Sequence, residues 1–508
     1  MVKTDNNIDI QSIPFTKFIT DFKETLSELF AERNQREQEF TERAFSKTFY
    51  DKLLSHTPLS VAIPSLYGGR GAHPRECISL LQAASYESIP LTLIFGINIA
   101  LFIEPFAKYG QEEIKQGIFD KFLQEGGMGG LMITEPAHGS DALNMKTAYT
   151  QDENGSYQIK GTKHWQGLTG MADYWLVAAR SQKECGALGR DVDLFVSEDH
   201  MPAQHINVTK LYNNNGLYPI PYGINEIDIT LPSTHRLIPE TTGIKMLMDT
   251  LHRSRMQFPG MATGFVKRAL DEATKHCRER IVRGNSLLQF DQIQKQLVQL
   301  ETSYTICSAM CFRSATSTSI KDDLALRGIE ANTFKAVVSD LMQESAQILM
   351  QLLGGKGYRI QSLGSRAIMD SRPFQIFEGP NEMLFTQLAE MMIKPMSRSK
   401  QMNLLEYMKT YENSSQSAGL FSQSINVTLE KAMPQRKLVL VGQAMAKVIL
   451  AHHVLSLSNS GFNQGMIDNC IDRLRCDVSN LMNSFAEQSE VMPTEGYDEG
   501  SSWHDCLD

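Results

Sequence analysis

Two stretches of the chain bring together residue types that can do chemistry. The first, residues 131–141, reads LMITEPAHGSD, and its hydroxyls and backbone N–H groups could hold an anionic or amide-rich ligand. A simple turn after a strand has the same composition. The second, residues 351–382, contains Gly354 and Gly355 at a helix end and places Glu378 between an aromatic residue and a glycine. Desolvation beside an apolar ring raises the basicity of a carboxylate, as a general base requires, although most loop glutamates are solvated.

The common signatures of several other site classes are missing from the sequence. No dinucleotide-binding glycine pattern follows a strand, and the phosphate-binding loop, zinc-protease and serine-hydrolase motifs are absent. The cysteines and histidines have no metal-ligand spacing, so we expect no metal site.

Composition limits the class and the compartment of the protein. The 508 residues include 49 Lys+Arg and 58 Asp+Glu, and the net charge of −9 argues against a nucleic-acid surface. Eight cysteines without a CxxC pair and a start without a signal or transit pattern predict a cytoplasmic location. The apolar run 89–103 is too short to span a membrane, and the run 438–457 contains histidines and a lysine. We therefore expect two buried helices and no membrane span.

The elements that must position these residues change along the chain. Hydrophobic spacing predicts helices with glycine and proline breaks over 13–125, and then short strands to about residue 232, with a hairpin turn at 152–155. From residue 243 the helical pattern returns, with a polar, flexible break near 413 and a loose acidic tail over the last eighteen residues. The fold class is mainly α with a central β domain. The predicted domains are 1–130 (helical), 131–242 (β), 243–398 (helical bundle) and 399–508 (a helical extension with the acidic tail).

Four motifs, taken in order, resemble the signatures of the acyl-CoA dehydrogenase family. They are TEPAHGSD at 134–141, YQIKGTKHWQG at 157–167, QLLGGKGY at 351–358 and SRPFQIFEGPNE at 371–382. Further segments look like that family's recurring ones, for example SLYGGRG near residue 66 and RALDEATKHCRER from residue 268. The resemblance covers roughly residues 45–395 and implies a helical domain, a β-barrel-like domain and a helical bundle.

The resemblance also implies FAD, bound between the β domain and the second helical domain. By similarity Ile133 and Thr134 would hold the pyrimidine edge of the flavin, and Ser140 would lie near the pyrophosphate and the thioester's pantetheine. Trp165 would pack against the isoalloxazine, although it could also be a core tryptophan. Arg280 would reach the FAD of a neighbouring subunit, or be only a solvated charge. The remaining residues with an implied cofactor contact are Gln351, Gly354, Gly355 and Asn381.

Glu378 matches the family's catalytic base, which takes the α-proton of an acyl thioester while the β-hydride passes to flavin N5. The base's own backbone N–H and a ribose hydroxyl of FAD would polarise the thioester carbonyl. Some members carry the base just before the arginine that here is Arg255, but that position is Ser254, which cannot serve. Arg255 and Gly379 would lie on the substrate side, and Arg255 could equally be a structural ion-pair partner.

Four departures from the family pattern suggest a diverged member. Gln166 and Gly167 follow Trp165 where an aliphatic residue and a hydroxyl residue are usual. The other three are Arg283 in place of an aromatic residue, Pro380 after Gly379, and His252 in place of an aspartate.

Several functions remain open from the sequence. The first is an FAD-dependent dehydrogenase of an acyl-CoA that passes electrons to a flavoprotein. An oxidase using O₂, a dehydrogenase of an acyl-carrier-protein thioester, and a silent flavin-binding scaffold are the alternatives. The implied reach of Arg280 across subunits predicts a homodimer or homotetramer, and the extension from 399 reads as extra packing helices.

Overall fold

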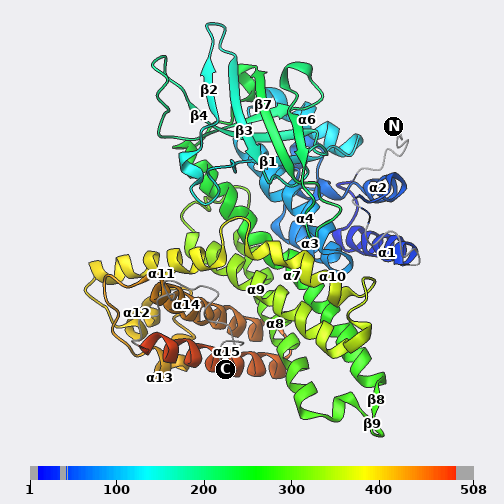
Figure 1. Ribbon diagram of the computed structural model, residues 1–508, viewed down its shortest axis with the longest axis vertical. Helices are drawn as coiled ribbons and strands as arrows, with labels where there is room; N and C mark the ends of the chain where they lie inside the picture. The colour runs from blue at the N-terminus through cyan, green and yellow to red at the C-terminus, as the bar shows by residue number, and fades with distance from the viewer. Residues whose placement is uncertain (1–9, 35–41, 43, 488–508) are drawn as a thin grey trace, which may run out of the picture.

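The molecule has a curled sheet at one end, helices behind that sheet, and a helical bundle with an added helical layer at the other end (Figure 1). This computed structural model describes residues 10–34, 42 and 44–487, so the predicted acidic tail lies outside the described residues. The mainly α architecture with a central β part, expected from the sequence, is confirmed.

The first part of the chain is helical, as the hydrophobic spacing predicts. Its α-helices are α1 (Phe15–Asn34), α2 (Lys47–Leu54), α3 (Pro74–Glu87), α4 (Ile89–Asn98), α5 (Glu104–Tyr109) and α6 (Glu112–Gln124). Short 3₁₀ turns, η2 (Pro58–Ala62) and η3 (Ser65–Tyr67), join α2 to α3.

Helices α4 and α5 are parts of one continuous helix, because the π-helical turn η4 (Ile99–Ile103) joins them. At the start of α5 the buried Glu104 accepts a hydrogen bond of 2.8 Å from Gln257 of α7. The whole run, Ile89–Tyr109, is long and apolar enough to cross a membrane, as is Gln435–Ser460. Our expectation that the first run is too short was therefore wrong. Its expected burial is confirmed, since 94% of its apolar window lies inside the protein, against 67% for the second run.

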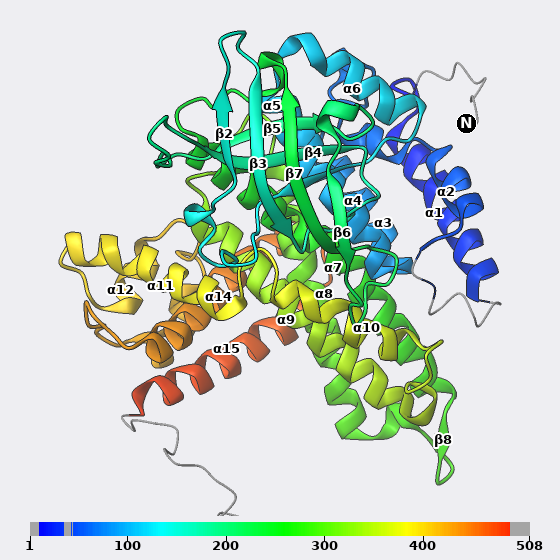
Figure 2. The same ribbon diagram turned by 45° about the horizontal axis from the view of Figure 1, so that its top comes forward.

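Seven strands form one curled, mixed sheet that carries the first candidate motif (Figure 2). They are β1 (Gly129–Met132), β2 (Ala148–Gln151), β3 (Tyr157–His164), β4 (Tyr174–Ser181), β5 (Asp193–Glu198), β6 (Asn207–Leu211) and β7 (Gly223–Leu231). Their order is β1-β4-β2-β3-β7-β6, with β5 paired to β4, and β4 runs parallel to β1 and β2. The predicted hairpin is confirmed, because β2 and β3 pair antiparallel around the turn at 152–155.

The bundle that follows the sheet is built on the long helix α7 (Gly243–Glu279), which packs against α3, α8 and α9. The other bundle helices are α8 (Asp291–Ser317), α9 (Gly328–Leu353), α10 (Leu363–Ser371) and α11 (Asn381–Arg398). A tiny hairpin of β8 (Ile281–Val282) and β9 (Asn285–Ser286) projects from the end of α7 (Figure 1). The 3₁₀ turns from the sheet onward are η5 (Ala142–Asn144), η6 (Pro202–Gln204), η7 (Ser233–His235), η8 (Leu287–Gln289), η9 (Gly354–Lys356) and η10 (Arg372–Gln375).

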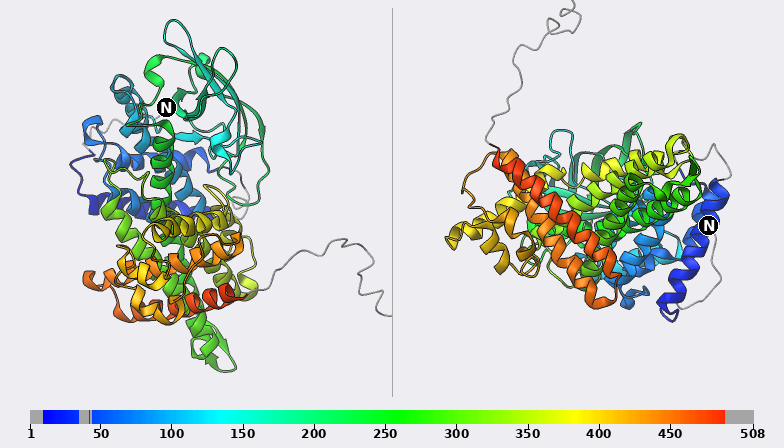
Figure 3. Two further views of the ribbon diagram at one scale, coloured as in Figure 1. Left: turned by 90° about the vertical axis from the view of Figure 1, so that its left-hand side faces the viewer. Right: turned by 90° about the horizontal axis from the view of Figure 1, so that it is seen from below.

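The C-terminal extension forms an extra helical layer on the bundle, away from the sheet (Figure 3). It contains α12 (Leu404–Thr410), η11 (Ala418–Phe421), α13 (Ser422–Ile425), α14 (Gln435–Ser456), η12 (Leu457–Ser460) and α15 (Gln464–Ala486). Helix α14 crosses α11 closely, because a Cβ at Gly442 would lie 2.1 Å from the Phe385 carbonyl oxygen. The predicted flexible break near 413 is wrong in one respect. Ser414 and Ser417 are fully buried, and their hydroxyls donate to the carbonyls of Met408 and Val448.

Candidate active site

Glu378 lies on a tight turn between η10 and α11. Its φ is +53°, and that of Gly379 is +98°, so two consecutive residues adopt the left-handed region. This conformation is uncommon for a glutamate and persists only where surrounding contacts hold it. Phe377 directly precedes Glu378. Its ring packs against those of Phe258 and Phe374, with ring centroids 6.0 and 5.0 Å apart.

Two cationic side chains hold the carbonyls of this turn. Arg255 of α7 donates from Nη2 to the Glu378 carbonyl oxygen at 2.7 Å, and from Nη1 to Asn332 at 2.7 Å. Lys335 of α9 donates from Nζ to the Gly379 carbonyl oxygen at 2.7 Å. Both are deeply buried, Arg255 at 5% exposed and Lys335 at 0%. The base candidate is therefore fixed by its backbone from two different helices.

The two carboxylate oxygens of Glu378 have different environments. Oε1 accepts a 2.8 Å hydrogen bond from the Ser254 hydroxyl, whereas Oε2 is buried and has no hydrogen-bond partner. Burial raises the pKa of Glu378, and Arg255, the Ser254 hydrogen bond and Lys335 each act to lower it. Within the described ranges the backbone N–H of Glu378 also has no acceptor. The site thus presents one free carboxylate oxygen and one free N–H donor.

Asp340 of α9 connects the two ends of the same turn. Its Oδ1 accepts from Gln375 Nε2 at 2.6 Å and from Asn381 Nδ2 at 2.7 Å. Asn381 is only 5% exposed, and its amide also donates to Ala336 and Ser339. The side chain of Asn381, expected to contact the cofactor, is therefore engaged within the chain.

The first motif forms a loop at the edge of the sheet, and Lys163 of β3 holds it. The Lys163 ammonium is fully buried and donates to the Ile133 carbonyl at 2.8 Å and to Glu135 Oε1 at 3.0 Å. The Thr134 carbonyl accepts from the His164 backbone N–H at 3.0 Å. Ile133 and Thr134 are half-buried, and Ser140 further along the loop is exposed.

Trp165 follows β3 with a φ of +62° and is 52% exposed, so its indole is a surface group and not a core one. Its ring lies 4.4 Å from that of Tyr212. The unusual Gly167 has a packing reason, because a Cβ there would lie 2.7 Å from Ile97 Cδ1. A side chain at this position would therefore require the end of the Ile97 side chain to move.

The remaining predicted residues lie at the ends of α7 and α9 and are not brought to the Glu378 turn. Arg280 is exposed at the end of α7, and Gln351, Gly354 and Gly355 are exposed at the end of α9. Burial, Lys356 and Arg280 all lower the pKa of His276, which shows that the two helix ends are adjacent. The predicted residues thus lie in three places, at the sheet edge (the 133–140 loop and Trp165), at the Glu378 turn between η10 and α11, and at the ends of α7 and α9.

Sequence reasoning missed three residues that contact the turn. Ser254 was set aside as unable to act as a base, yet it bonds the Glu378 carboxylate. Lys335 and Asp340 received no role, although each is a charged residue within a run of apolar residues on α9, FKAVVSDL. A lysine in such a run could have indicated a structural or functional role, because lysines are almost never fully buried unless they are paired. No group of three or more potential metal ligands occurs in the described part of the chain.

The chain thus combines a helical part, a curled mixed sheet and a helical bundle that holds a buried carboxylate with one unpaired oxygen. Three family models match consecutive parts of the chain, the acyl-CoA dehydrogenase N-terminal domain at 18–144, middle domain at 130–228 and C-terminal domain at 241–393. The chain belongs to the acyl-CoA dehydrogenase family.

Individual relatives agree with this family. The chain is 26% identical over 384 residues to a short-chain specific acyl-CoA dehydrogenase of Megasphaera elsdenii, covering 74% of this chain and 96% of that protein. It is also 26% identical to an acyl-CoA dehydrogenase of Bacillus subtilis over 340 residues, 65% of this chain and 86% of that protein.

Solved structures share the fold. Butyryl-CoA dehydrogenase from Megasphaera elsdenii has a TM-score of 0.64 at 24% identity, covering 75% of this chain and 98% of that one. An acyl-CoA dehydrogenase complexed with FAD from Bacillus anthracis has a TM-score of 0.74 at 16% identity. That similarity covers 96% of this chain and 93% of the other, so it includes the C-terminal extension.

The family uses FAD, and several of the similar structures are FAD or FADH₂ complexes. The residues of this chain fit such a group. The exposed Trp165 indole offers a flat surface, Glu378 keeps an unpaired oxygen, and Gly354 and Gly355 have no atom within 4 Å of a built Cβ.

Proposed function

We propose that the protein catalyses the α,β-dehydrogenation of an acyl thioester, with Glu378 as the base that takes the α-proton. The observation that carries this proposal is the Glu378 carboxylate, which is desolvated, anchored through Oε1 and free at Oε2. A carboxylate held in this way has a raised affinity for a proton and needs no reorganisation before reaction.

The backbone of the same turn supplies the second element. An α C–H bond is weakly acidic, so the thioester carbonyl must be polarised while the base acts. The free N–H of Glu378 is the donor that we assign to this task. FAD, when bound, supplies the acceptor for the β-hydride.

For the cofactor we propose the residues that form two groups in the chain. Ile133, Thr134 and Ser140 lie on the loop after β1, and Trp165 directly follows β3, at one edge of the sheet. Arg280, Gln351, Gly354 and Gly355 lie at the helix ends, and we propose that they serve the site of a second copy in a homodimer or homotetramer. Arg255 and Gly379 are proposed on the substrate side.

The acyl carrier and electron acceptor are further proposals. Similar structures include a butyryl-CoA dehydrogenase, a glutaryl-CoA dehydrogenase and a prolyl acyl carrier protein oxidase. We propose an acyl-CoA substrate and a flavoprotein acceptor in the cytoplasm. An oxidase is the second candidate, favoured by Gly167, because this position has no hydroxyl for the flavin.

The test is anaerobic titration of the purified protein with a panel of acyl-CoA thioesters, followed by flavin absorbance. Wild type is expected to bleach, and Glu378→Gln to bleach at least about 1,000-fold more slowly, which is the size of a general-base contribution. Glu382→Gln, at an exposed position four residues on, is the matched control and is expected to behave as wild type. Peroxide formed during aerobic turnover identifies the oxidase.

One result would contradict the acyl-CoA substrate, and another would contradict the proposed reaction as a whole. Bound flavin that no thioester bleaches would exclude acyl-CoA substrates and direct the search to carrier-protein thioesters. Purified protein that binds no flavin would favour a binding scaffold.

A further inference from the structure

We propose that Lys335 is a positioning residue of this site, which fixes the turn of Glu378 and supplies the positive charge that keeps its carboxylate ionised. The inference rests on the proposed function only in taking Glu378 as the base. Lys335 contacts neither the unpaired Oε2 of Glu378 nor the loop at 133–140, so it would act through Glu378.

The first argument is the placement of Lys335. It lies in the first third of α9 among residues 331–339, all of which are buried, and it is 0% exposed. Burying an ammonium group is costly unless its donors and charge are used, and an apolar residue would pack here more cheaply. The hydrogen-bond partners of Lys335 are neutral, the Gly379 carbonyl at 2.7 Å and Asn381 Oδ1 at 2.9 Å. The charge is therefore not neutralised by a carboxylate in direct contact.

The second argument is the geometry of the turn. The carbonyls of Glu378 and Gly379 are consecutive, and each accepts from a different cation, Arg255 and Lys335. Glu378 has a φ of +53°, an uncommon conformation for a glutamate that must be held by its surroundings. Lys335 also bonds Asn381, the first residue of α11, and so ties the turn to the helix that follows it. Arg255 alone would hold only one of the two carbonyls.

The third argument is the set of charges around Lys335. Burial lowers the pKa of Lys335 to about 7, Glu378, Asp340 and Glu382 oppose this, and Arg255 adds to it. Conversely, Arg255 and Lys335 are the cations that lower the pKa of Glu378 against its burial.

Histidine does not add to this positive charge. His252 of α7 is buried near Arg255, and burial lowers its pKa to about 4, so it is neutral near pH 7. Removal of the Lys335 charge is therefore expected to raise the pKa of Glu378.

The experiment measures protonation of Glu378 directly in the flavin-loaded full-length protein. A pH-difference infrared spectrum contains a carboxyl C=O band for Glu378, which is identified by its loss in Glu378→Gln. The expected result for Lys335→Met, which keeps the length of the side chain, is a midpoint about one pH unit higher than in wild type. Lys335→Gln keeps an N–H donor without charge and is expected to shift the midpoint in the same direction. Lys335→Arg keeps the charge and is expected to restore the wild-type midpoint.

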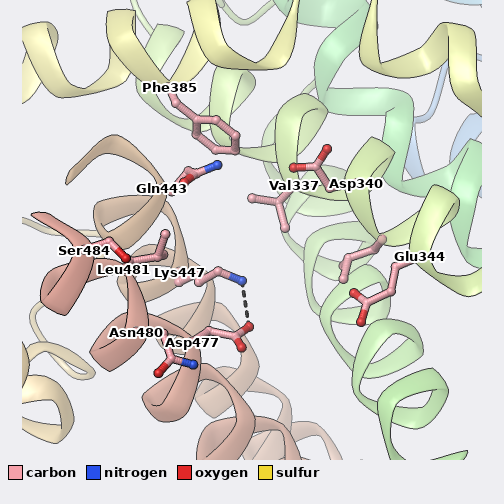
Figure 4. A pocket seen from close by; sticks show the side chains of 11 residues that line it. Val337, Asp340, Glu344, Phe385, Gln443, Lys447, Asp477, Asn480, Leu481 and Ser484 are labelled. Atoms are coloured by element: carbon pink, nitrogen blue, oxygen red, sulfur yellow. Dashed lines mark hydrogen bonds and ion pairs between the residues drawn. The ribbon is translucent and has the colours of Figure 1, made fainter. Parts of the chain in front are cut away.

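A matched control lysine lies on the extension. Lys447 of α14 lines a groove of about 370 Å³ between α9 and α15, where it pairs with Asp477 at 2.8 Å (Figure 4). It also lowers the pKa of Asp340, but it does not contact the turn. Lys447→Met is therefore expected to leave the Glu378 midpoint unchanged.

A folded, flavin-loaded Lys335→Met or Lys335→Gln protein with a wild-type midpoint would overturn the inference. If neither neutral variant folds but Lys335→Arg does, the Glu378 midpoint in Lys335→Arg decides. A midpoint that differs from wild type by a full pH unit would also overturn the inference. The infrared titration needs no substrate, so it gives a result even if no thioester bleaches the flavin. Where a thioester does bleach it, the acidic limb of the reduction rate must move with the infrared midpoint.

Discussion

Two fully buried lysines, Lys163 in the sheet and Lys335 in the bundle, hold the two loops that we propose form the site. Lys163 donates to the Ile133 carbonyl and Lys335 to the Gly379 carbonyl, at 2.8 and 2.7 Å. The difference lies in their second partner. Lys163 also contacts a buried carboxylate, Glu135, whereas the second partner of Lys335 is the neutral amide of Asn381.

This difference separates a structural ion pair from a charge that is available to a neighbour. Around Lys163 the positive and negative charges cancel, and Glu135 is further satisfied by the backbone N–H groups of Lys146 and Thr147. Lys335 instead lowers the pKa of Glu378, although its ammonium does not contact that carboxylate. A buried lysine therefore pairs with a carboxylate in the sheet, whereas in the bundle we propose that it adjusts the pKa of Glu378.

The largest effect is expected from Lys163→Met. It leaves Glu135 buried without its cation, and breaking a buried pair costs about 3–5 kcal/mol. Denaturant unfolding should show this loss together with weaker flavin binding. The double variant Lys163→Met/Glu135→Leu, which removes both charges, should recover most of the stability. If Lys163→Met proves as stable as wild type, the two lysines do not differ as described.

Lys335→Met is expected to change the free energy of unfolding by less than about 2 kcal/mol. It removes donors from two acceptors, which costs about 1–3 kcal/mol, but it also removes the cost of burying an ammonium. The same denaturant measurement at pH 7 compares it with Lys163→Met. A loss as large as that of Lys163→Met would show that Lys335 is held by an equivalent pair.

The two lysines also predict different pH windows. Burial lowers the pKa of Lys335 to about 7 and that of Lys163 to about 8, both below the usual 10.5. Above each folded pKa the unfolded chain binds the extra proton, so stability rises with pH. Between pH 7 and 8 this rise comes mainly from Lys335. The slope of unfolding free energy against pH in this window should flatten in Lys335→Met and persist in Lys163→Met.

A last prediction concerns Ser254→Ala. Loss of the hydrogen bond to Glu378 Oε1 should raise the pKa of Glu378, because this bond stabilises the ionised carboxylate. The infrared midpoint measures this shift, with Thr250→Ala on the same helix as the control, since that hydroxyl bonds only the Met246 carbonyl. A midpoint that stays at the wild-type value in Ser254→Ala would show that this hydroxyl does not stabilise the ionised carboxylate.

Local sequence patterns predicted the elements, and the family motifs predicted Glu378, but the contacts of Glu378 were out of reach. Strand alternation and helical spacing depend on near neighbours, so β7 and α9 could be located from them. Ser254 and Glu378 are 124 residues apart, and only the packing of α7 against the turn joins them. Gly167 looked like a lost hydroxyl. Its close approach to Ile97, a residue seventy positions away, could be seen only in the structure. Ser414 and Ser417 were misjudged because burial of a serine depends on a carbonyl that another helix provides.

The π-helical turn at Ile99–Ile103 sets the directions in which the later side chains of that helix point. A π turn inserts one residue, and each residue of an α-helix advances the side-chain direction by about 100°. Glu104 comes directly after the turn and meets Gln257 of α7, the helix that also carries Ser254 and Arg255. Without the inserted residue, Glu104 would point along a different radius and α7 would lose this partner. Deletion of one residue from this turn would therefore rotate the helix that follows rather than only shorten it. Through the lost contact with Gln257 it would affect α7, which carries Ser254 and Arg255.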